Sequence, residues 1–197
     1  IKGDIEIVGL SAANWNFGVG KKEELFRKLD AKPLKLKNIA AKIAQGIRTS
    51  ANEVYVLDIV SMDGNTVKAK SKALNKEVEL EKEILCQFLQ GREIKPYQTR
   101  SSGKVVIIPY KISDGHLHLL TEDEILQKYP KTYNYLLENR AFLENREHGR
   151  MRGANWYAYI YPKNIEVMKG SKILIPDIAN RASFALDEAG EYAFTSG

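Results

Sequence analysis

The sequence predicts a mixed α+β fold. Segments dense in strand-forming residues and segments with helical spacing of apolar residues both occur, without the regular strand–helix alternation of a doubly wound sheet. Hydrophobic residues make up 44% of the 197 residues, enough to bury one substantial core or two small lobes. We find no internal repeat, low-complexity tract or linker rich in Gly, Pro or Ser. These observations favour an irregular globular unit.

The chain is expected to begin with an extended segment and a short helix. Within residues 1–17, Ile5 and Ile7 alternate with polar positions and Trp15 and Phe17 repeat this spacing, which predicts extended chain. No cap or initiator methionine marks a natural start, so we take Ile1 as a cut inside a longer protein. Residues 21–29 place apolar side chains at helical spacing, with acidic residues three or four positions before basic ones, and Pro33 ends this helix. The bare Ser196-Gly197 looks like a second cut.

A hairpin and further strands are predicted next. Residues 53–60 are dense in strand formers, and Asp63-Gly64-Asn65 supplies turn residues before an alternating run resumes. Residues 76–80 predict another strand. Residues 81–89 place apolar side chains on one helical face and predict a helix. The apolar run at 105–108 predicts a buried strand.

The second half begins with a strand at 117–119 and a helix with a recognisable start. Thr121 and Glu124 form a capping box, in which each side chain bonds to the other residue's backbone amide, and the helix is expected to run to about residue 129. Pro130 then starts a longer helix to about residue 147. Further strands are predicted at 172–175 and 192–194.

Targeting and membrane signals are not recognisable in the sequence. No run approaches the roughly 18 apolar residues of a membrane-spanning helix, and the N-terminus lacks the order of a signal peptide. We therefore expect a cytoplasmic location. The single cysteine, Cys86, has apolar neighbours and is expected to be a buried small hydrophobe, so neither redox chemistry nor a cysteine-based metal site is expected.

Positive charge is concentrated in three separated windows. Residues 1–52 hold ten basic and five acidic side chains, residues 91–115 five and two, and residues 150–175 five and one. The remaining segments hold ten basic and seventeen acidic side chains, within a total net charge of +5. Folding that gathers the windows would create one phosphate-facing surface. Chance clustering on a solvated surface is the alternative.

Three short motifs point to chemistry that the surrounding sequence does not support. The glycines of residues 16–20 resemble a cofactor loop, but the expected strand and helix around it are missing, and no Asn-Pro-Pro-Tyr tetrapeptide occurs. Glu93 and Lys95 have the spacing of Mg²⁺-dependent nucleases without a Pro-Asp shortly before them. His116 and His118 lack an apparent third metal ligand.

Basic and aromatic side chains recur in groups suited to DNA, where cations contact phosphates or guanine edges and aromatic rings pack on the backbone. A core position for the aromatic residues is the alternative, above all for Trp156. The candidate DNA-binding residues are Arg48, Thr49, Asn52, Arg92, Lys95, Tyr97, Arg100, Arg146, Arg150, Arg152, Trp156, Tyr157 and Lys163. No catalytic or metal-binding residue is expected.

Three blocks in the expected order, together spanning nearly the whole chain, resemble the TaqI-like C-terminal specificity domain of adenine-specific DNA methyltransferases and single-chain restriction-modification enzymes. The blocks are Gly46-Ile47-Arg48-Thr49 with Asn52 before the strand at 54–57; Leu89 and Gly91-Arg92-Glu93-Ile94-Lys95 with Tyr97 and Ile107-Ile108-Pro109-Tyr110; and Tyr129-Pro130, Tyr135-Leu136, Leu143, Arg146, Trp156-Tyr157 and Lys172-Ile173-Leu174-Ile175-Pro176-Asp177-Ile178.

The resemblance implies an irregular β-helix-like arrangement of mixed strands with a helical hairpin. It also implies one target-recognition domain over residues 1–197, with a lead-in and first helix at 1–30 and the specificity core at 31–197. Such a domain binds double-stranded DNA without catalysis or a cofactor of its own. The catalytic domain of the same parent chain would use S-adenosylmethionine, and Mg²⁺ if the parent also cleaves DNA. Family members usually continue beyond the last strand predicted here.

Two other classes of function remain open. A small Mg²⁺-dependent nuclease would use Glu93 and Lys95. A docking module would bind only another protein subunit.

Overall fold

The structure, a computed structural model, describes residues 21–99 and 102–195. The expected extended segment at 1–17 lies outside the described residues. The chain divides into two units, residues 1–43 and residues 44–197. Within the described ranges, no helix is both long and apolar enough to cross a membrane.

The first unit contains the predicted helix and one short additional turn. Helix α1 (Lys21–Asp30) confirms the helical spacing, and the pair Glu23–Arg27 at 2.7 Å joins residues four apart on its surface. Helix α2 (Leu36–Ile39) is a single turn that the sequence analysis missed.

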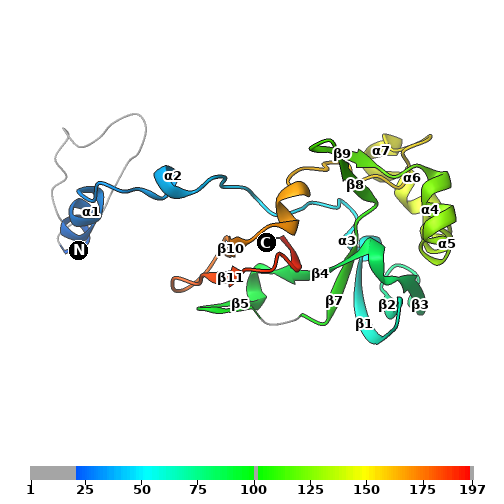
Figure 1. The fold of residues 1–197 in the computed structure, drawn as a ribbon, viewed down its shortest axis with the longest axis horizontal. Helices are drawn as coiled ribbons and strands as arrows, with labels where there is room; N and C mark the ends of the chain where they lie inside the picture. Colours follow the sequence, from blue (N-terminus) through cyan, green and yellow to red (C-terminus); the bar gives the residue numbers. More distant parts are fainter. Residues whose placement is uncertain (1–20, 100–101, 196–197) are drawn as a thin grey trace. The chain divides into compact units, whose positions relative to one another are not determined.

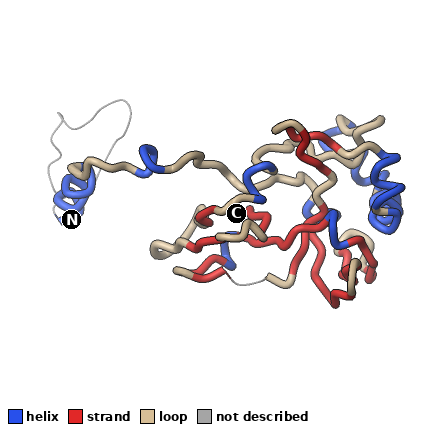
Figure 2. The backbone as a smooth tube through the Cα atoms, viewed as in Figure 1, coloured by secondary structure: helices blue, strands red, loops and turns tan. Residues whose placement is uncertain are grey.

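The second unit is built on a six-stranded mixed sheet with the strand order β12-β4-β7-β1-β2-β3 (Figures 1 and 2). Neighbouring strands are antiparallel except β12 and β4, which are parallel. The strands are β1 (Val56–Asp63), β2 (Thr66–Ser71), β3 (Lys76–Glu81), β4 (Leu85–Gln90), β7 (Lys104–Ile107) and β12 (Tyr192–Thr195). Two-stranded sheets pair β5 (Ile94–Lys95) with β6 (Gln98–Thr99), β8 (Tyr110–Ser113) with β9 (His116–Leu119), and β10 (Lys172–Leu174) with β11 (Ala185–Asp187). The predicted α+β class is confirmed.

Two helices form a hairpin beside the sheet. Helices α4 (Glu122–Lys128) and α5 (Pro130–Glu138) pack together, and α5 also packs against β3 (Figure 1). The predicted capping box is confirmed, since Thr121 Oγ1 accepts from the Glu124 amide at 3.2 Å and Glu124 Oε2 accepts from the Thr121 amide at 2.9 Å. Glu81 accepts from the backbone amide of Thr132 at 2.9 Å, which places a carboxylate at the positive end of α5.

Three predictions of secondary structure need correction. Residues 81–89 are not a helix: a 3₁₀ turn, η2 (Lys82–Ile84), leads into strand β4 between β7 and β12, because strand pairing satisfies this segment's backbone on both sides. The strand expected from residue 53 begins at Val56, after the helical turn α3 (Asn52–Tyr55). The long helix expected at 130–147 is broken into α5, α6 (Arg140–Glu144) and α7 (Arg146–Gly149).

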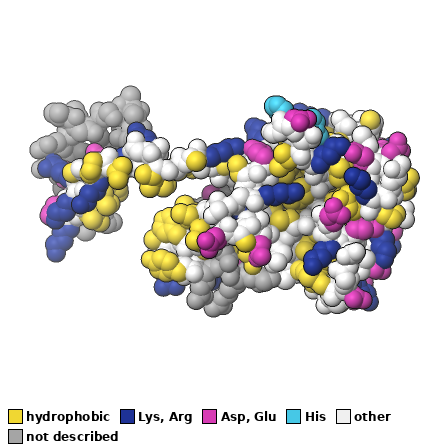
Figure 3. All heavy atoms as spheres, in the orientation of Figure 1, with side chains coloured by type: hydrophobic (Ala, Val, Ile, Leu, Met, Phe, Trp, Pro, Cys, Tyr) yellow, Lys and Arg dark blue, Asp and Glu magenta, His cyan; other side chains and the backbone are white. Residues whose placement is uncertain are grey.

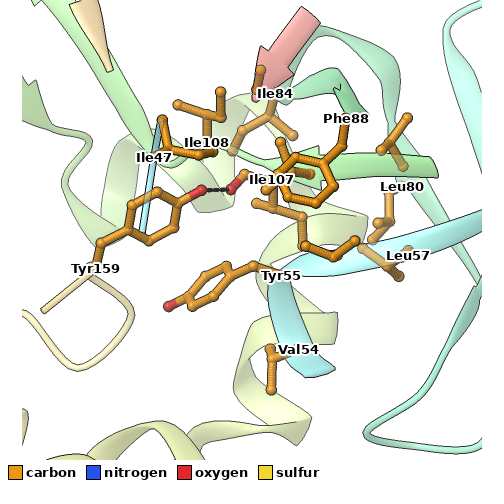
Figure 4. Close-up of a cluster of buried hydrophobic side chains, with 14 of the residues drawn as sticks. Ile47, Val54, Tyr55, Leu57, Leu80, Ile84, Phe88, Ile107, Ile108 and Tyr159 are labelled. Atoms are coloured by element: carbon orange, nitrogen blue, oxygen red, sulfur yellow. Dashed lines mark hydrogen bonds between the residues drawn. The ribbon is translucent and has the colours of Figure 1, made fainter. Parts of the chain in front are cut away.

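The core includes buried side chains from the sheet, from helices α4 to α6 and from the loop that follows α7. Buried tyrosines join the sheet to that loop. The Tyr55 and Tyr159 rings pack edge to face with centroids 4.9 Å apart, and the Tyr159 hydroxyl donates to the carbonyl of Ile107 (Figure 4). The Tyr55 hydroxyl donates to the carbonyl of Tyr157 at 2.7 Å. Burial raises the pKa of both Tyr55 and Tyr159 above the ordinary range, because an ionised phenol is poorly solvated there. These contacts fix the path of residues 156–161 over the core.

The segment at Gly46 approaches the last strand very closely. The Ile47 amide donates to the carbonyl of Phe194 at 2.8 Å. A Cβ atom at Gly46 would lie 1.9 Å from that carbonyl oxygen, so only glycine fits this crossing. The crossing sets where the following residues, including Arg48, emerge at the surface.

Candidate nucleic-acid interface

Arg146 is a buried tie between segments. The residue is 7% exposed, and its guanidinium donates to the carbonyls of Leu143 at 2.8 Å and of Trp156 and Ala158 at 2.9 Å each. A longer contact of 3.4 Å reaches the carbonyl of Thr49. Arg146 thereby joins α6, residues 156–158 and the loop before α3. We assign it a structural role rather than a DNA contact.

Three more candidate residues lie inside the protein. Trp156 is fully buried, and its indole nitrogen donates to Glu122 at 2.8 Å. Tyr157 is buried, and its hydroxyl donates to the carbonyl of Leu120 at 2.6 Å. The Thr49 hydroxyl donates to Asn52 at 2.6 Å. These side chains hold the loops in place, and a DNA contact in this arrangement would have to come from their exposed neighbours.

The exposed candidates beside Arg146 gather where three segments meet. Arg48 forms an antiparallel bridge with Tyr161, and the Tyr161 hydroxyl donates to Glu147 at 2.7 Å. Asn164 donates to the carbonyl of Gln45 at 2.9 Å, which is a second link between the segment that contains Arg48 and the segment that contains Tyr161. We call this region the Arg48 surface. Its exposed members are Arg48, Asn52, Arg150, Arg152, Tyr161 and Lys163.

A hollow of about 360 Å³ lies in the Arg48 surface. Residues 47–53, Tyr161 and Thr195 line it. Asn52 sits on its wall, where its side-chain oxygen accepts from Thr49, so the amide nitrogen is the group presented away from Thr49. The charged residues that line the hollow are Arg48 and Glu53. The Arg48 guanidinium can contact a phosphate, and the oriented amide can bond to a polar group beside it.

Glu147 orients two side chains of this surface. Its carboxylate accepts from the Tyr161 hydroxyl at 2.7 Å and pairs with Arg150 at 3.0 Å. The hydrogen bond from Tyr161, reinforced by Arg150, lowers the pKa of Glu147 below its ordinary value, and the same contact raises the pKa of Tyr161. An ionised Glu147 therefore holds both side chains at this surface.

Left-handed backbone conformations cluster at the same place. Ser50, Glu147, His148 and Asn164 have φ values of 60°, 44°, 61° and 61°. Such conformations are uncommon for residues other than glycine and tend to collect at functional sites, where surrounding contacts impose them. At the Arg48 surface, these contacts include the Arg146 tie.

The second candidate group lies on the hairpin β5–β6 and on the preceding 3₁₀ turn η3 (Gly91–Glu93). Arg92, Lys95 and Tyr97 are exposed there, whereas Arg100 lies outside the described residues. In Figure 1, α7 lies with α6, β8 and β9 at one end of the second unit, and β5 lies beside β10 and β11 at the other. The predicted residues thus occupy two places, and contact of both with one duplex stays a prediction.

The motifs considered for metal chemistry have other partners. One oxygen of Glu93 accepts from the Gln90 amide at 2.7 Å, and the other pairs with Lys104 at 3.5 Å. His116 and His118 lie exposed on β9. In the described part of the chain, no group of three or more His, Cys, Asp and Glu residues is arranged to hold a metal ion.

Sequence reasoning missed Glu147 and Tyr161 as members of the site. Gly149 and Gly153 bracket the turn at residues 150–152, and both have positive φ. These glycines were the signal in the sequence that could have drawn attention to this turn. The role of Glu147 depends on a residue 14 positions away, so its own neighbourhood could not reveal it.

The chain is similar to three bacterial restriction-modification proteins. It is 26% identical to the type II methyltransferase M.BstVI of Geobacillus stearothermophilus, over 78% of this chain and 23% of that protein. It is 21% identical to the type II restriction enzyme and methyltransferase RM.Eco57I of Escherichia coli, over 90% and 19%. It is 24% identical to the type II methyltransferase M.PaeR7I of Pseudomonas aeruginosa, over 91% and 27%. The chain thus spans about a fifth to a quarter of these relatives. No family model matches it.

Proposed function

We propose that this chain is the DNA-recognition domain of a restriction-modification adenine-N6 DNA methyltransferase, of the TaqI-like kind. It binds double-stranded DNA through the Arg48 surface and has no catalytic activity of its own. The observation that carries the proposal is the Arg48 surface, which gathers exposed cations, an oriented amide and a hollow on constrained loops. The similarity to type II methyltransferases over most of this chain, but only a small part of theirs, supports a recognition role.

The proposal assigns the chemistry to another part of the parent chain. A catalytic methyltransferase domain there would bind S-adenosylmethionine and the extruded adenine, while this domain fixes the register of the duplex. Phosphate contacts supply affinity that weakens with salt, because each contact releases bound counterions. The nuclease alternative is less favoured because both oxygens of Glu93 already serve the fold.

The docking alternative has an observation in its favour. Ile173 and Leu186 pair across β10 and β11 and are 63% and 59% exposed. Ile178, in the segment that connects these strands, is 92% exposed. Figure 3 shows hydrophobic side chains gathered over β10 and β11. Exposed apolar patches often mark protein contacts. Light scattering across a range of concentrations, with and without Leu186→Glu, tests whether this face joins two copies.

The DNA-binding proposal is tested with a fluorescently labelled, mixed-sequence duplex about three helical turns long, titrated at salt concentrations from about 50 to about 200 mM. Arg48→Ala and Arg150→Ala should each weaken binding several-fold and reduce the slope of log affinity against log salt by about 1. Lys76→Ala is the matched control, because Lys76 is an exposed cation on β3 paired with Glu138. Absence of a complex at low salt, or equal losses in all three variants, would reject the proposal.

A further inference from the structure

An almost fully exposed aromatic ring stands at the turn of the hairpin β5–β6. Tyr97 is 94% exposed, more than any other large hydrophobic residue that the structure describes. It lies between Lys95 and Gln98, which face each other in the hairpin. Packing among the residues that the structure describes therefore does not explain this tyrosine.

The backbone at Tyr97 adopts a conformation that does not suit its side chain. Pro96 fixes its own φ near the usual proline value, and Tyr97 follows with φ +62°. A proline followed by a residue of positive φ is the arrangement of a type II turn, where glycine or asparagine is normal. The strain persists because the Tyr97 amide donates to the carbonyl of Phe184 at 2.7 Å, which anchors the turn to the segment before β11. The turn is held while its ring projects outward.

Two exposed cations precede this ring, Arg92 on the turn η3 and Lys95 on the strand β5. Lys95 is exposed, and the Arg92 side chain is 71% exposed despite its 3.7 Å contact with Glu93. An exposed aromatic face beside cations is the combination with which proteins hold nucleic-acid bases, since the ring stacks on a base and the cations contact the phosphates next to it.

We propose that Tyr97 stacks on the face of a nucleobase exposed where the bound duplex is opened, with Arg92 and Lys95 on the adjoining phosphates. This inference rests on the proposed function and adds a base-stacking residue to it. Extrusion of a target base disrupts stacking and leaves base faces exposed, which gives the ring a partner in duplex DNA. The Tyr97–Phe184 backbone bond holds the turn, so little backbone freedom at this position is lost on binding.

A protein surface is the competing partner, because the apolar face of β10 and β11 lies beside the hairpin. We favour the base because Arg92 and Lys95 are exposed cations in the segments that lead into the turn, and charged side chains are depleted at the cores of protein interfaces. A duplex with one central mismatched pair separates the two partners, since a mismatched base is extruded more easily than a paired one.

The experiment compares the affinity of the chain for this mismatched duplex and for the same duplex fully paired. The wild type should prefer the mismatched duplex several-fold. Tyr97→Ala should lower affinity for the mismatched duplex by about 5- to 100-fold and abolish the preference. Tyr97→Phe should retain both. Lys95→Ala should weaken binding to the two duplexes equally and reduce the salt slope by about 1.

One further variant and three outcomes complete the test. Tyr97→Gly should raise the urea midpoint of unfolding, because glycine suits the turn, and yet lose the preference for the mismatch. If the wild type binds DNA but Tyr97→Ala binds both duplexes as well as the wild type does, the inference fails and the proposed function stands. Absence of any complex would overturn both. Self-association that Tyr97→Ala abolishes, with DNA binding unchanged, would assign the ring to a protein contact.

Discussion

Arg146 illustrates how one side chain can organise a binding surface without belonging to it. Its position in the sequence among basic and aromatic residues predicted a DNA contact. From the sequence alone, Arg146 and Arg150 are both arginines of the same basic group, and nothing predicts different roles for them. The structure shows that their roles differ. Arg146 donates to carbonyls of three segments, whereas Arg150 pairs with Glu147 at the surface. Buried cations need several hydrogen bonds to offset their loss of hydration.

Replacing Arg146 should therefore destabilise the whole second unit. Arg146→Met leaves the buried carbonyls of Leu143, Trp156 and Ala158 without their donor, so the free energy of unfolding should fall by about 3 kcal/mol or more. Urea unfolding followed by circular dichroism measures the loss.

Arg150→Met is the matched control, because Arg150 is exposed and its removal should change the free energy of unfolding by no more than about 0.5 kcal/mol. Equal stability of the two variants would show that Arg146 does not hold the segments together.

Elements that depend on near neighbours in sequence were the ones that the sequence predicted well. The Thr121 capping box and the Asp63-Gly64-Asn65 turn each act within a few residues, and both helix α4 and hairpin β1–β2 are confirmed. Strand β4 was predicted as a helix because a short apolar run fits either periodicity. Its partner β12 lies about a hundred residues further along the chain. The pairing that makes this segment a strand rather than a helix therefore cannot be inferred from the neighbouring sequence.

The crossing of Gly46 over β12 gives an element-level prediction. A methyl group at this position would overlap the Phe194 carbonyl, so Gly46→Ala should force the two segments apart and lower the free energy of unfolding by about 2 kcal/mol or more. Urea unfolding and amide exchange of β12 measure the effect. Gly170→Ala is the control, because its nearest neighbour would lie 4.0 Å from the new Cβ and its φ is −97°. Loss of stability in both variants alike would argue against the crossing as the cause.

At the scale of the whole molecule, charge windows in the sequence predicted which segments carry the candidate residues but not how folding arranges them. Two windows contribute Arg48, Arg150 and Lys163 to the Arg48 surface, and the middle window forms the separate group at Arg92, Lys95 and Tyr97. Acidic and basic side chains are interspersed on the face drawn in Figure 3. Which cations lie together depends on long-range contacts, such as the Arg48–Tyr161 bridge, that composition does not encode.

The proposed division between a recognition unit and a separate catalytic part agrees with two features of the chain. The chain matches most of its own length to about a fifth to a quarter of much longer methyltransferases. Its constrained loops are suited to holding a duplex in a fixed register, which is the task that the proposal assigns to it.

Hydrogen–deuterium exchange with and without the duplex tests the central claim most directly, namely that DNA binds on the Arg48 surface. The account predicts slower exchange in residues 47–53, 147–153 and 161–164 when DNA is bound, and unchanged exchange in the exposed turn between β2 and β3. Slower exchange confined to β2, β3 and the α4–α5 hairpin, with the Arg48 surface unaffected, would contradict it.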